Sequence, residues 1–424
     1  MGQIFNHNTG KALNKTNSSG TNLSYITTSN LYWGSFELDT LKQMYFTESE
    51  IEKCTVRHGD LLVCEGGDIG RAAIWNYDYE IRIQNHIHKL RPFLGVNVKL
   101  YFYVFWLYKF SGRISGKGIG IQGLSSNQLH NIIIPLPPLQ EQNHIVSKIN
   151  KLLNIVDTIE INKTDLQSTV QQAKSKILDL AIQGKLVPQD PNDEPASVLL
   201  ERIRAEKEEL IKQGKIKRDK KESVIFKSED NSYYIQTGSL IEELGDWSLN
   251  CLPDSWGICC LGEVCDYGSC VNVGTDCIED DAWILDLEDI EKDTGRVIKK
   301  VKKSERSAMS TKHSFKKGQV LYSKLRPYLN KVVLADEDGY CTSEILPLDF
   351  NSLVLPAYAR YYLMTPAFLA YANRCSYGVK MPRLSTSDGK KAVMTIPPLA
   401  EQKRIVAAIE TYYSKLDKIA EMLT

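Results

Sequence analysis

One hydrophobic pattern occurs twice in this chain and constrains its fold more than any other feature. The motif Pro-Pro-Leu-Gln-Glu-Gln at 137–142 opens a stretch in which apolar residues recur at alternating steps of four and three as far as Leu180. A second motif, Pro-Pro-Leu-Ala-Glu-Gln at 397–402, opens a similar stretch 260 residues later. Such steps place side chains on one stripe of a helix, and a fixed long offset indicates a duplicated unit. We therefore expect two similar domains, each followed by a helix.

The two stripes predict that these helices pair with each other as a coiled coil. A helix over 137–180 would be about 60 Å long, far longer than an ordinary core helix. The residues expected to pair are Ile145, Ile149, Leu152, Val156 and Ile159 on the first helix, and Ile405, Ile409, Tyr412, Leu416 and Ile419 on the second.

The rest of the chain divides around these helices. Short strands and a buried helix are expected before the first motif, for example strands over 60–64 and 72–75 and a helix over 100–110. Landmarks such as Leu-Ser at 124–125 and 384–385 keep the offset of 260, whereas the sequence between landmarks diverges. The predicted segments are an α+β domain at 1–136, a helix at 137–184, a linker with a short charged helix at 185–246, a second α+β domain at 247–396 and a final helix at 397–424.

Composition excludes several classes of protein. The 424 residues include 52 basic and 52 acidic side chains, so no global field attracts nucleic acid or an anionic membrane. A local basic groove remains possible within that balance. No apolar run is long enough to span a bilayer, and the N-terminus lacks a secretory pattern. Ten cysteines in such a chain indicate reduced thiols and a cytoplasmic location.

Motifs that could carry chemistry are weak. The glycines at 118, 120 and 123 have dinucleotide-fingerprint spacing, but a proline-rich segment follows where that fingerprint needs a helix. His86 and His88 lack an evident third metal ligand, and the Pro-Pro-Leu motifs lack the polar residue that grips a flipped base. The cysteines at 259, 260, 265, 270 and 277 are crowded without zinc-knuckle spacing. We predict no metal site, no cofactor bound by this chain and no catalytic residue.

Basic and polar side chains recur at similar loop positions in both predicted domains. Arg, Lys and Gln are the side chains that hold phosphates or read purine edges in DNA. Each one alone is more often a solvated surface charge, but their recurrence in both domains favours a DNA-binding role. The candidates are Arg71, Lys117 and Gln122 in the first domain, and Lys324, Arg326, Lys331, Lys380 and Arg383 in the second.

At this point the sequence resembles the specificity subunit of Type I restriction–modification enzymes. The residues that carry the resemblance are Pro-Leu-Pro-Pro-Leu-Gln-Glu-Gln at 135–142 and its copy at 397–402, Ala-Ile-Gln-Gly-Lys-Leu-Val-Pro-Gln at 181–189, and Leu-Tyr-Ser-Lys-Leu-Arg-Pro-Tyr at 321–328. The resemblance implies an α+β fold with two pseudo-symmetric target recognition domains, separated by long antiparallel coiled-coil helices. Each domain would read one half of a split site in double-stranded DNA.

The resemblance also implies partners that carry the chemistry. Two modification subunits would supply S-adenosylmethionine-dependent methylation, and restriction subunits would use ATP and Mg for translocation and cleavage. The chain itself would be a non-catalytic DNA reader and scaffold. The segment from Leu166 to Leu180, left over from helix pairing, would contact a modification subunit or a second copy. Two alternatives remain open from the residues alone, namely a solitary DNA methyltransferase and a coiled-coil interaction protein with no DNA role.

Overall fold

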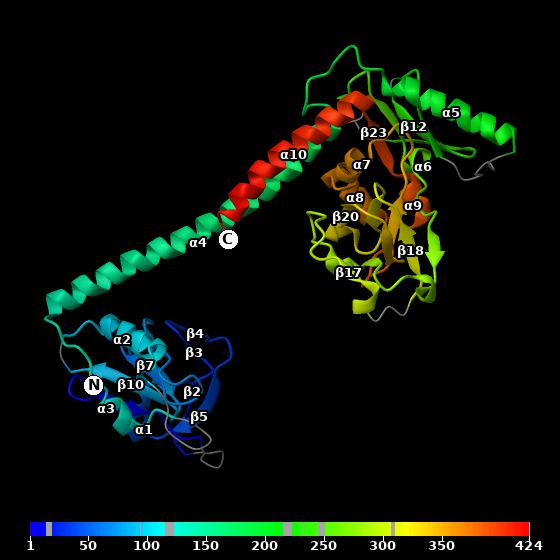
Figure 1. Cartoon of the computed structure of the whole chain (residues 1–424). Helices are drawn as coiled ribbons and strands as arrows, with labels where there is room; N and C mark the ends of the chain where they lie inside the picture. The colour runs from blue at the N-terminus through cyan, green and yellow to red at the C-terminus, as the bar shows by residue number, and fades with distance from the viewer. Residues whose placement is uncertain are drawn as a thin grey trace. The chain divides into compact units, whose positions relative to one another are not determined.

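The chain forms two compact units in a computed structural model that describes residues 1–13, 19–93, 95–114, 123–214, 223–230, 232–244, 251–306 and 310–423. Unit 1 comprises Met1–Ile161 and unit 2 comprises Asn162–Thr424. Helix α4 (Leu139–Ile182) contributes residues to both (Figure 1). Two predicted DNA-binding residues, Lys117 and Gln122, lie outside the described residues. No described helix is long and apolar enough to cross a lipid bilayer.

Unit 1 is a mixed α+β body with two four-stranded sheets. The first has the order β1 (Phe5–Thr9), β10 (Ile87–Pro92), β7 (Leu61–Cys64), β8 (Ala72–Ile74). The second has the order β5 (Lys42–Phe46), β2 (Thr21–Ile26), β9 (Ile81–Ile83), β6 (Thr55–Val56). A small ladder pairs β3 (Leu31–Tyr32) with β4 (Ser35–Phe36), and the helices are α1 (Glu48–Cys54), α2 (Val98–Phe110) and α3 (Ser126–His130).

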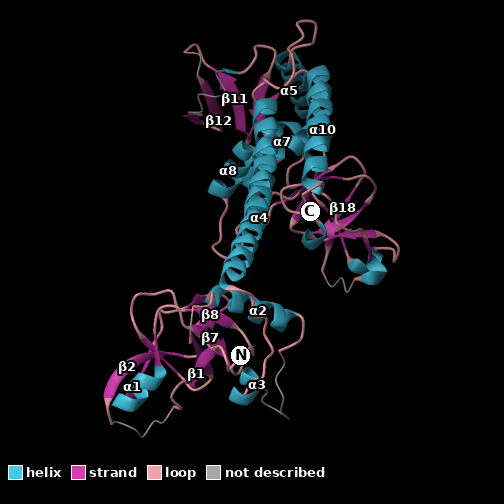
Figure 2. Ribbon diagram, turned by 90° about the vertical axis from the view of Figure 1, so that its left-hand side faces the viewer, coloured by secondary structure: helices cyan, strands magenta, loops and turns pink. Residues whose placement is uncertain are grey.

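Unit 2 also combines helices and strands, drawn in cyan and magenta in Figure 2, and its sheets are related to those of unit 1. One sheet has the order β20 (Val332–Leu334), β19 (Val320–Ser323), β22 (Ile345–Leu348), and another the order β15 (Val271–Val273), β18 (Lys312–Phe315), β21 (Gly339–Thr342), β16 (Trp283–Leu285), β17 (Val301–Lys302). β14 (Gly257–Cys260) pairs with β23 (Val393–Ile396). The helices are α5 (Ala196–Lys212), α6 (Leu261–Val264), α7 (Pro356–Leu363), α8 (Pro366–Cys375), α9 (Thr386–Lys391) and α10 (Leu399–Glu421).

The duplication predicted from the sequence is confirmed by seven strands that match in order between the units. The order β8-β7-β10 in unit 1 matches β20-β19-β22 in unit 2, and β5-β2-β9-β6 matches β17-β16-β21-β18. Each second sheet contains one parallel pair, β2 with β9 and β16 with β21. The α+β fold class and the predicted strands over 60–64 and 72–75 are likewise confirmed. The helix predicted at 100–110 is present but is buried on one face only, since Leu107 and Phe110 are 62% and 70% exposed.

The glutamine of each Pro-Pro-Leu motif explains why a helix begins there. Gln142 is buried, donates to the carbonyl of Pro137 and accepts from the amide of Asn97, the residue that caps α2. Gln402 donates to the carbonyl of Pro397 and accepts from the amide of Leu355, which caps α7. A buried carboxamide with both ends hydrogen-bonded therefore fixes the start of α4 against the start of α2, and the start of α10 against the start of α7.

The predicted linker at 185–246 needs correction. Its first part contains the expected charged helix, α5, but the apolar face of that helix packs into the core of unit 2 through Ala196 and Leu200. Its second part forms the sheet β11 (Ser223–Lys227), β12 (Tyr233–Thr237), β13 (Leu240–Glu243), in which Ile225 is buried against β14. The basic run at 215–221 lies outside the described residues.

The predicted pairing of helices also needs correction. Helix α10 packs against the second half of α4, where Leu178 and Ala181 share a buried cluster with Ile405 and Ile409. The two helices run antiparallel. Lys174 of α4 forms an ion pair with Asp417 near the end of α10, whereas the carbonyl of Ile182 at the end of α4 accepts from Thr395, which lies just before α10. The first-helix residues expected in the seam do not form it. Ile145 and Ile149 line a groove of unit 1, and Leu152, Val156 and Ile159 are exposed.

The register within α10 differs from the prediction as well. Tyr413, rather than Tyr412, reaches α4 by donating its hydroxyl to the carbonyl of Lys174. Tyr412 and Ile419 are exposed, whereas Leu416 is half-buried. The sequence could not choose between these rows because aliphatic residues occupy several neighbouring stripes of both helices. The segment ending at Leu180, predicted to lack a partner, is the part of α4 that α10 covers.

This seam predicts unequal effects of two isoleucine substitutions in α10. Ile409→Ala should lower the free energy of unfolding by about 2–5 kcal/mol, because it leaves a cavity in a closed seam. The matched variant Ile419→Ala, at a residue that is 41% exposed, should cost less than about 1 kcal/mol. Urea unfolding of both variants checks this, and equal losses would contradict the register described here.

Candidate nucleic-acid interface

The same loop connects two sheet strands in each unit, and the two copies together carry four of the eight predicted DNA-binding residues: Arg71, Lys324, Arg326 and Lys331. In unit 1 the β7–β8 loop spans 65–71, and in unit 2 the β19–β20 loop spans 324–331. The amide of Glu65 donates to the carbonyl of His86, and its carbonyl accepts from Leu124. At the equivalent position Lys324 donates to Glu344 and accepts from Leu384. The two loops are therefore held by the same main-chain hydrogen bonds.

Both loops turn through two residues with left-handed backbone. Unit 1 uses Gly67 and Gly70, with φ of 72° and 82°. Unit 2 uses Arg326 and Asn330, both with φ of 49°. A side chain at such a position costs about 1–2 kcal/mol, and strain of this kind is concentrated at functional sites. Arg326 is further fixed because its amide donates to the carbonyl of Pro382 in the next loop.

Two of the predicted DNA-binding residues are internal anchors. Arg71 donates from Nη2 to the carbonyl of Thr28 at 2.7 Å, and its guanidinium lies 5.3 Å from the ring centre of Tyr32. Lys331 occupies the equivalent place and donates from Nζ to the carbonyl of Leu287, also at 2.7 Å. The two cations therefore attach their loops to equivalent segments, which follow β2 in unit 1 and β16 in unit 2. Burial lowers the pKa of Lys331.

Arg383 is also engaged within the protein. Its guanidinium forms a two-pronged ion pair with Glu344, with Nη2 and Nε lying 2.8 and 3.0 Å from the two carboxylate oxygens. The hydrogen bonds from Arg383 hold the pKa of Glu344 below its usual range. The pair joins the turn between β21 and β22 to the 376–383 loop, next to Lys324. The structure thereby brings Lys324, Arg326 and Arg383 together on adjoining loops.

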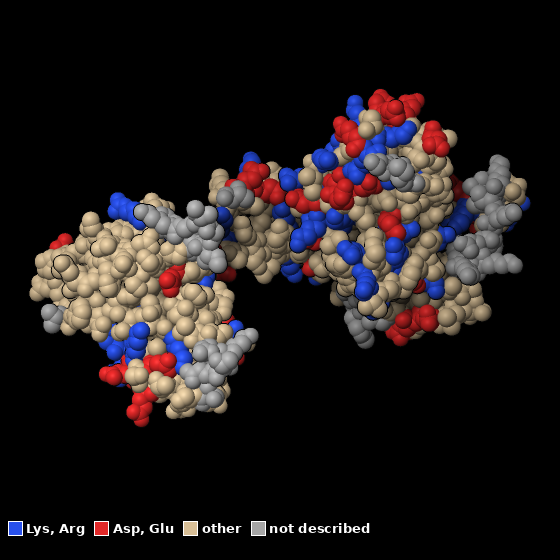
Figure 3. All heavy atoms as spheres, turned by 90° about the horizontal axis from the view of Figure 1, so that it is seen from below, with Lys and Arg blue, Asp and Glu red and all other residues tan. Residues whose placement is uncertain are grey.

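The 376–383 loop presents the most exposed of the predicted residues. The amide of Tyr377 donates to the carbonyl of Arg383, and the amide of Arg383 donates to the carbonyl of Tyr377. These two hydrogen bonds close the base of the loop. Between them, Val379 and Lys380 are exposed, and the ring of Tyr377 is 61% exposed. Figure 3 shows Lys and Arg interspersed with Asp and Glu over the visible face of unit 2. Binding there would depend on local placement of cations rather than on a broad basic field.

Charge is reversed between equivalent positions of the two loops, which residue-type reasoning missed. Glu65 of unit 1 corresponds to Lys324 of unit 2, and His86 corresponds to Glu344. His86 Nδ1 lies 3.7 Å from the Glu65 carboxylate. The offset of about 260 residues could have identified Glu65, but a search for basic residues passes over a carboxylate.

Three histidines form a hydrogen-bonded chain beneath the unit 1 loop. His88 Nε2 lies 2.7 Å from the carbonyl of Leu124, which only accepts, so this nitrogen carries the proton. With His88 neutral, its Nδ1 accepts from His7 Nε2 at 2.8 Å, and His7 Nδ1 accepts from His130 Nε2 at 3.0 Å. In this arrangement a neutral His7 donates with one ring nitrogen and accepts with the other. Burial, followed by the neighbouring His88, lowers the pKa of His7 from 6.5 to about 4.

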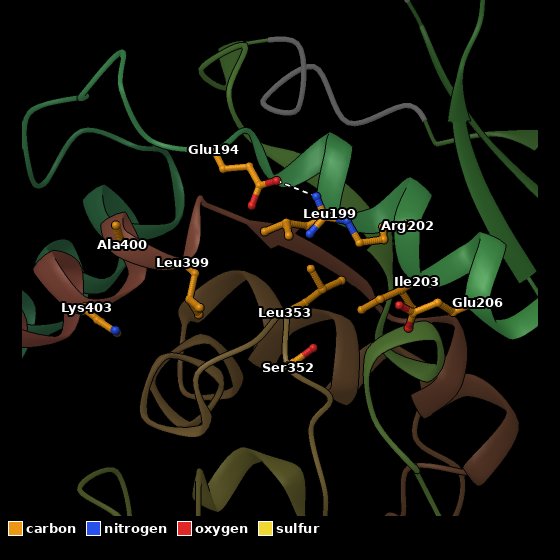
Figure 4. A pocket seen from close by; sticks show the side chains of 10 residues that line it. All are labelled: Glu194, Leu199, Arg202, Ile203, Glu206, Ser352, Leu353, Leu399, Ala400 and Lys403. Atoms are coloured by element: carbon orange, nitrogen blue, oxygen red, sulfur yellow. Dashed lines mark hydrogen bonds and ion pairs between the residues drawn. The ribbon is translucent and has the colours of Figure 1, made fainter.

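A hollow of about 360 Å³ in unit 2 lies away from these loops (Figure 4). Side chains of α5, the 352–353 segment and the start of α10 line it. Arg202 donates to Glu194 across one side, and Lys403 lies at another. The predicted DNA-binding residues do not line it, and its side chains offer no nucleophile paired with a base.

Within the described ranges, no group of three or more His, Cys, Asp or Glu side chains is placed to hold a metal ion. Burial raises the pKa of the Cys259 and Cys265 thiols, which keeps these side chains protonated as packing groups. The β7–β8 loop of unit 1 and the β19–β20 loop of unit 2 are held by the same main-chain hydrogen bonds but carry opposite charges at Glu65 and Lys324. These features define a protein built from two copies of a recognition domain.

Comparison with known proteins agrees with this class. The family described as "Type I restriction modification DNA specificity domain" matches residues 1–171 and again 253–423. The chain therefore belongs to this family and carries two copies of its domain. It is similar to the EcoDI specificity subunit of Escherichia coli, with 24% identity over 361 residues that cover 84% of this chain and 71% of that protein.

Solved structures share the fold. The HsdS subunit from Thermoanaerobacter tengcongensis matches with a TM-score of 0.54 at 15% identity, covering 100% of this chain and 90% of that one. A chain from a structure of type I R-M complex assembly and conformational transition matches with a TM-score of 0.56, also at 15% identity, covering 100% and 91%. The predicted function, a non-catalytic DNA-specificity subunit of a Type I restriction–modification system, is confirmed at the level of the family. Membership argues against the methyltransferase and coiled-coil alternatives.

The histidine chain predicts that acid destabilises the protein. Because the folded pKa of His7 lies below 6.5, its contribution to stability is present above pH 6.5 and is lost as the pH falls toward about 4. The urea midpoint should therefore fall between about pH 7.5 and about pH 5, and His7→Gln should reduce that fall. His58→Gln, at an exposed histidine, is the control. If the urea midpoint of His7→Gln showed the same pH dependence as that of the unmodified protein, the role assigned to the hydrogen-bonded histidines would be refuted.

The anchoring role of Lys331 predicts a loss of stability that an exposed lysine does not share. Lys331→Met removes the ammonium group that donates to the partly buried carbonyl of Leu287, and it should lower the free energy of unfolding by about 1–3 kcal/mol. Lys380→Met, on the exposed 376–383 loop, should change it by less than about 0.5 kcal/mol. Thermal or urea unfolding distinguishes the two, and a neutral Lys331→Met would show that the carbonyl contact is dispensable.

Proposed function

We propose that the two units read the two parts of a bipartite DNA sequence, one part each. The observation that carries this proposal is the duplicated loop, with the same main-chain hydrogen bonds and opposite charges at Glu65 and Lys324. Two loops that share a backbone conformation but carry different side chains at one position are suited to bind different targets. A single recognition surface would not need the frame twice.

The chemistry of each loop favours a different base. A lysine ammonium donates to O6 and N7 of guanine, whereas a carboxylate accepts from the N4 amino group of cytosine. Lys324 would therefore favour guanine in one half-site and Glu65 cytosine in the other. Exposed Lys380 would bind phosphate, which adds affinity without sequence preference. Arg71 and Lys331 would act indirectly, by holding the loops in shape.

The partners and cofactors follow the family. Two modification subunits would methylate adenine with S-adenosylmethionine, and restriction subunits would use ATP and Mg, while this chain binds none of these cofactors. Helix α4 contributes to both units, and a helix is a stiffer connector than a Gly/Ser linker.

Selection from a random DNA library tests the proposal, using the purified chain alone or with its modification subunits. Lys324→Gln should weaken the preference for guanine in one half-site only, and Glu65→Gln the preference for cytosine in the other only. Each loss should be about 5- to 150-fold, corresponding to about 1–3 kcal/mol per base contact. Lys380→Gln is the control and should lower affinity for all sequences alike. If either loop variant altered both half-sites, or neither, the proposal would fail.

A further inference from the structure

The tip of the 376–383 loop in unit 2 exposes three apolar or aromatic side chains close together. Val379 is fully exposed, and Tyr377 and Met381 are 61% and 44% exposed. Single exposed apolar residues are common on protein surfaces, but three within the five residues 377–381 form a patch. Because Val379 is fully exposed, it gains nothing from packing within the described part of unit 2.

The base of this loop is held in place, so the tip is presented in a defined conformation. The amide of Arg326 donates to the carbonyl of Pro382 at 2.7 Å, which attaches the loop to the β19–β20 loop. The ion pair of Arg383 attaches it to the turn between β21 and β22. Gly378 begins the tip with a left-handed backbone, at φ of 95°. A preformed loop of this kind loses little conformational freedom when it binds a target.

Cations accompany the apolar tip. Lys380 stands between Val379 and Met381 in the chain, and Lys324 and Arg326 lie on the adjoining loop. No described residue pairs with the ammonium of Lys380, and none accepts from Nε of Arg326. Protein–protein interfaces have few lysines at their centre and use about 20–30 residues on each side. A small apolar tip among basic side chains is better suited to a nucleic acid.

The sequence of the other domain copy is apolar at the same two positions. At the offset of 260, Val379 and Met381 correspond to Ile119 and Ile121, and a glycine precedes both Val379 and Ile119. The two copies otherwise diverge between their landmarks. Aliphatic residues at both positions are therefore not explained by overall similarity of the copies, and they indicate a shared role.

We propose that Val379, supported by Met381, is a wedge that enters the base stack of the DNA half-site bound by unit 2. Apolar side chains of DNA-binding proteins can unstack a base step in this way while nearby cations hold the phosphates. Pyrimidine–purine steps unstack most easily, so the wedge favours such a step at one position without reading a base edge. The inference rests on the proposed function and adds to it a source of specificity other than hydrogen bonds.

Selection from a random DNA library, repeated with Val379→Ser, tests the wedge. The unmodified chain should enrich a pyrimidine–purine step at one position of the unit 2 half-site. Val379→Ser should lose that enrichment while keeping the preference for guanine attributed to Lys324. Its affinity for the selected duplex should fall at least about tenfold, because the burial of a valine side chain is lost. The variant should fold normally, since this side chain is fully exposed.

The base analogue 2-aminopurine, placed at the purine of that step, reports unstacking because stacking quenches its fluorescence. Binding of the unmodified chain should raise the fluorescence. Val379→Ser should abolish the rise, whereas Val379→Leu, which keeps an apolar side chain, should retain it. The control is Val198→Ser, the same change at an exposed residue of α5, which lines the hollow away from these loops. It should alter neither readout.

The wedge is wrong if the fluorescence rise persists in Val379→Ser. It is also wrong if Val379→Ser loses affinity although the unmodified chain gives no rise, which would indicate an ordinary contact such as one with a thymine methyl group. Loss of modification-subunit binding at unchanged DNA affinity would assign the tip to a protein partner instead. If the unmodified chain selects no sequence, the proposed function fails and the wedge with it, whereas selection without a fluorescence rise refutes the wedge alone.

Discussion

Burial of the apolar face of α4 in two separate cores is the interaction on which the rest of the structure depends. In unit 1 Val146 belongs to the cluster beneath α2, and in unit 2 Leu178 and Ala181 belong to the cluster beneath α10. Each buried aliphatic side chain contributes about 1.5–3 kcal/mol, whereas a helix exposed on all sides is only marginally stable in water. The buried glutamines Gln142 and Gln402 then fix where each long helix starts. Long helices therefore exist here because each unit anchors one.

The two loops show that one backbone frame can carry different side chains. Main-chain hydrogen bonds hold the loop the same way in both units, so the side chain at the presented position can change without altering the fold. Arg71 and Lys331 keep the anchoring role although one is a guanidinium and the other an ammonium. Under the proposed function, the shared anchoring residues would maintain stability, while the residue that differs between the loops would determine recognition. The left-handed Arg326 and Asn330 show that unit 2 tolerates strain where unit 1 uses glycine.

Internal comparison was more informative about function than any single motif. A residue in one unit has a counterpart near 260 positions away, and differences in burial between counterparts identify surfaces that the fold leaves open. Glu141 and Glu401 share a motif, yet one is exposed and the other is hydrogen-bonded in a core. Their sequence neighbourhoods are almost identical, so only the surrounding structure separates them. Glu65 and Lys324 are counterparts in the same way, although their charges are opposite.

The sequence by itself determined the duplication, the α+β class, the long helices and the strands beside the β7–β8 loop, because periodicity and copied motifs are local and survive in linear order. Only the tertiary structure decided which half of α4 pairs with α10, because apolar residues occur along the whole of α4 and either half could have packed against another helix. It also decided the roles of the basic residues: Arg383 is bound by Glu344, 39 positions away, and Lys331 by a carbonyl 44 positions away. Contacts across such separations depend on how strands and loops come together, and no local pattern in the chain encodes them.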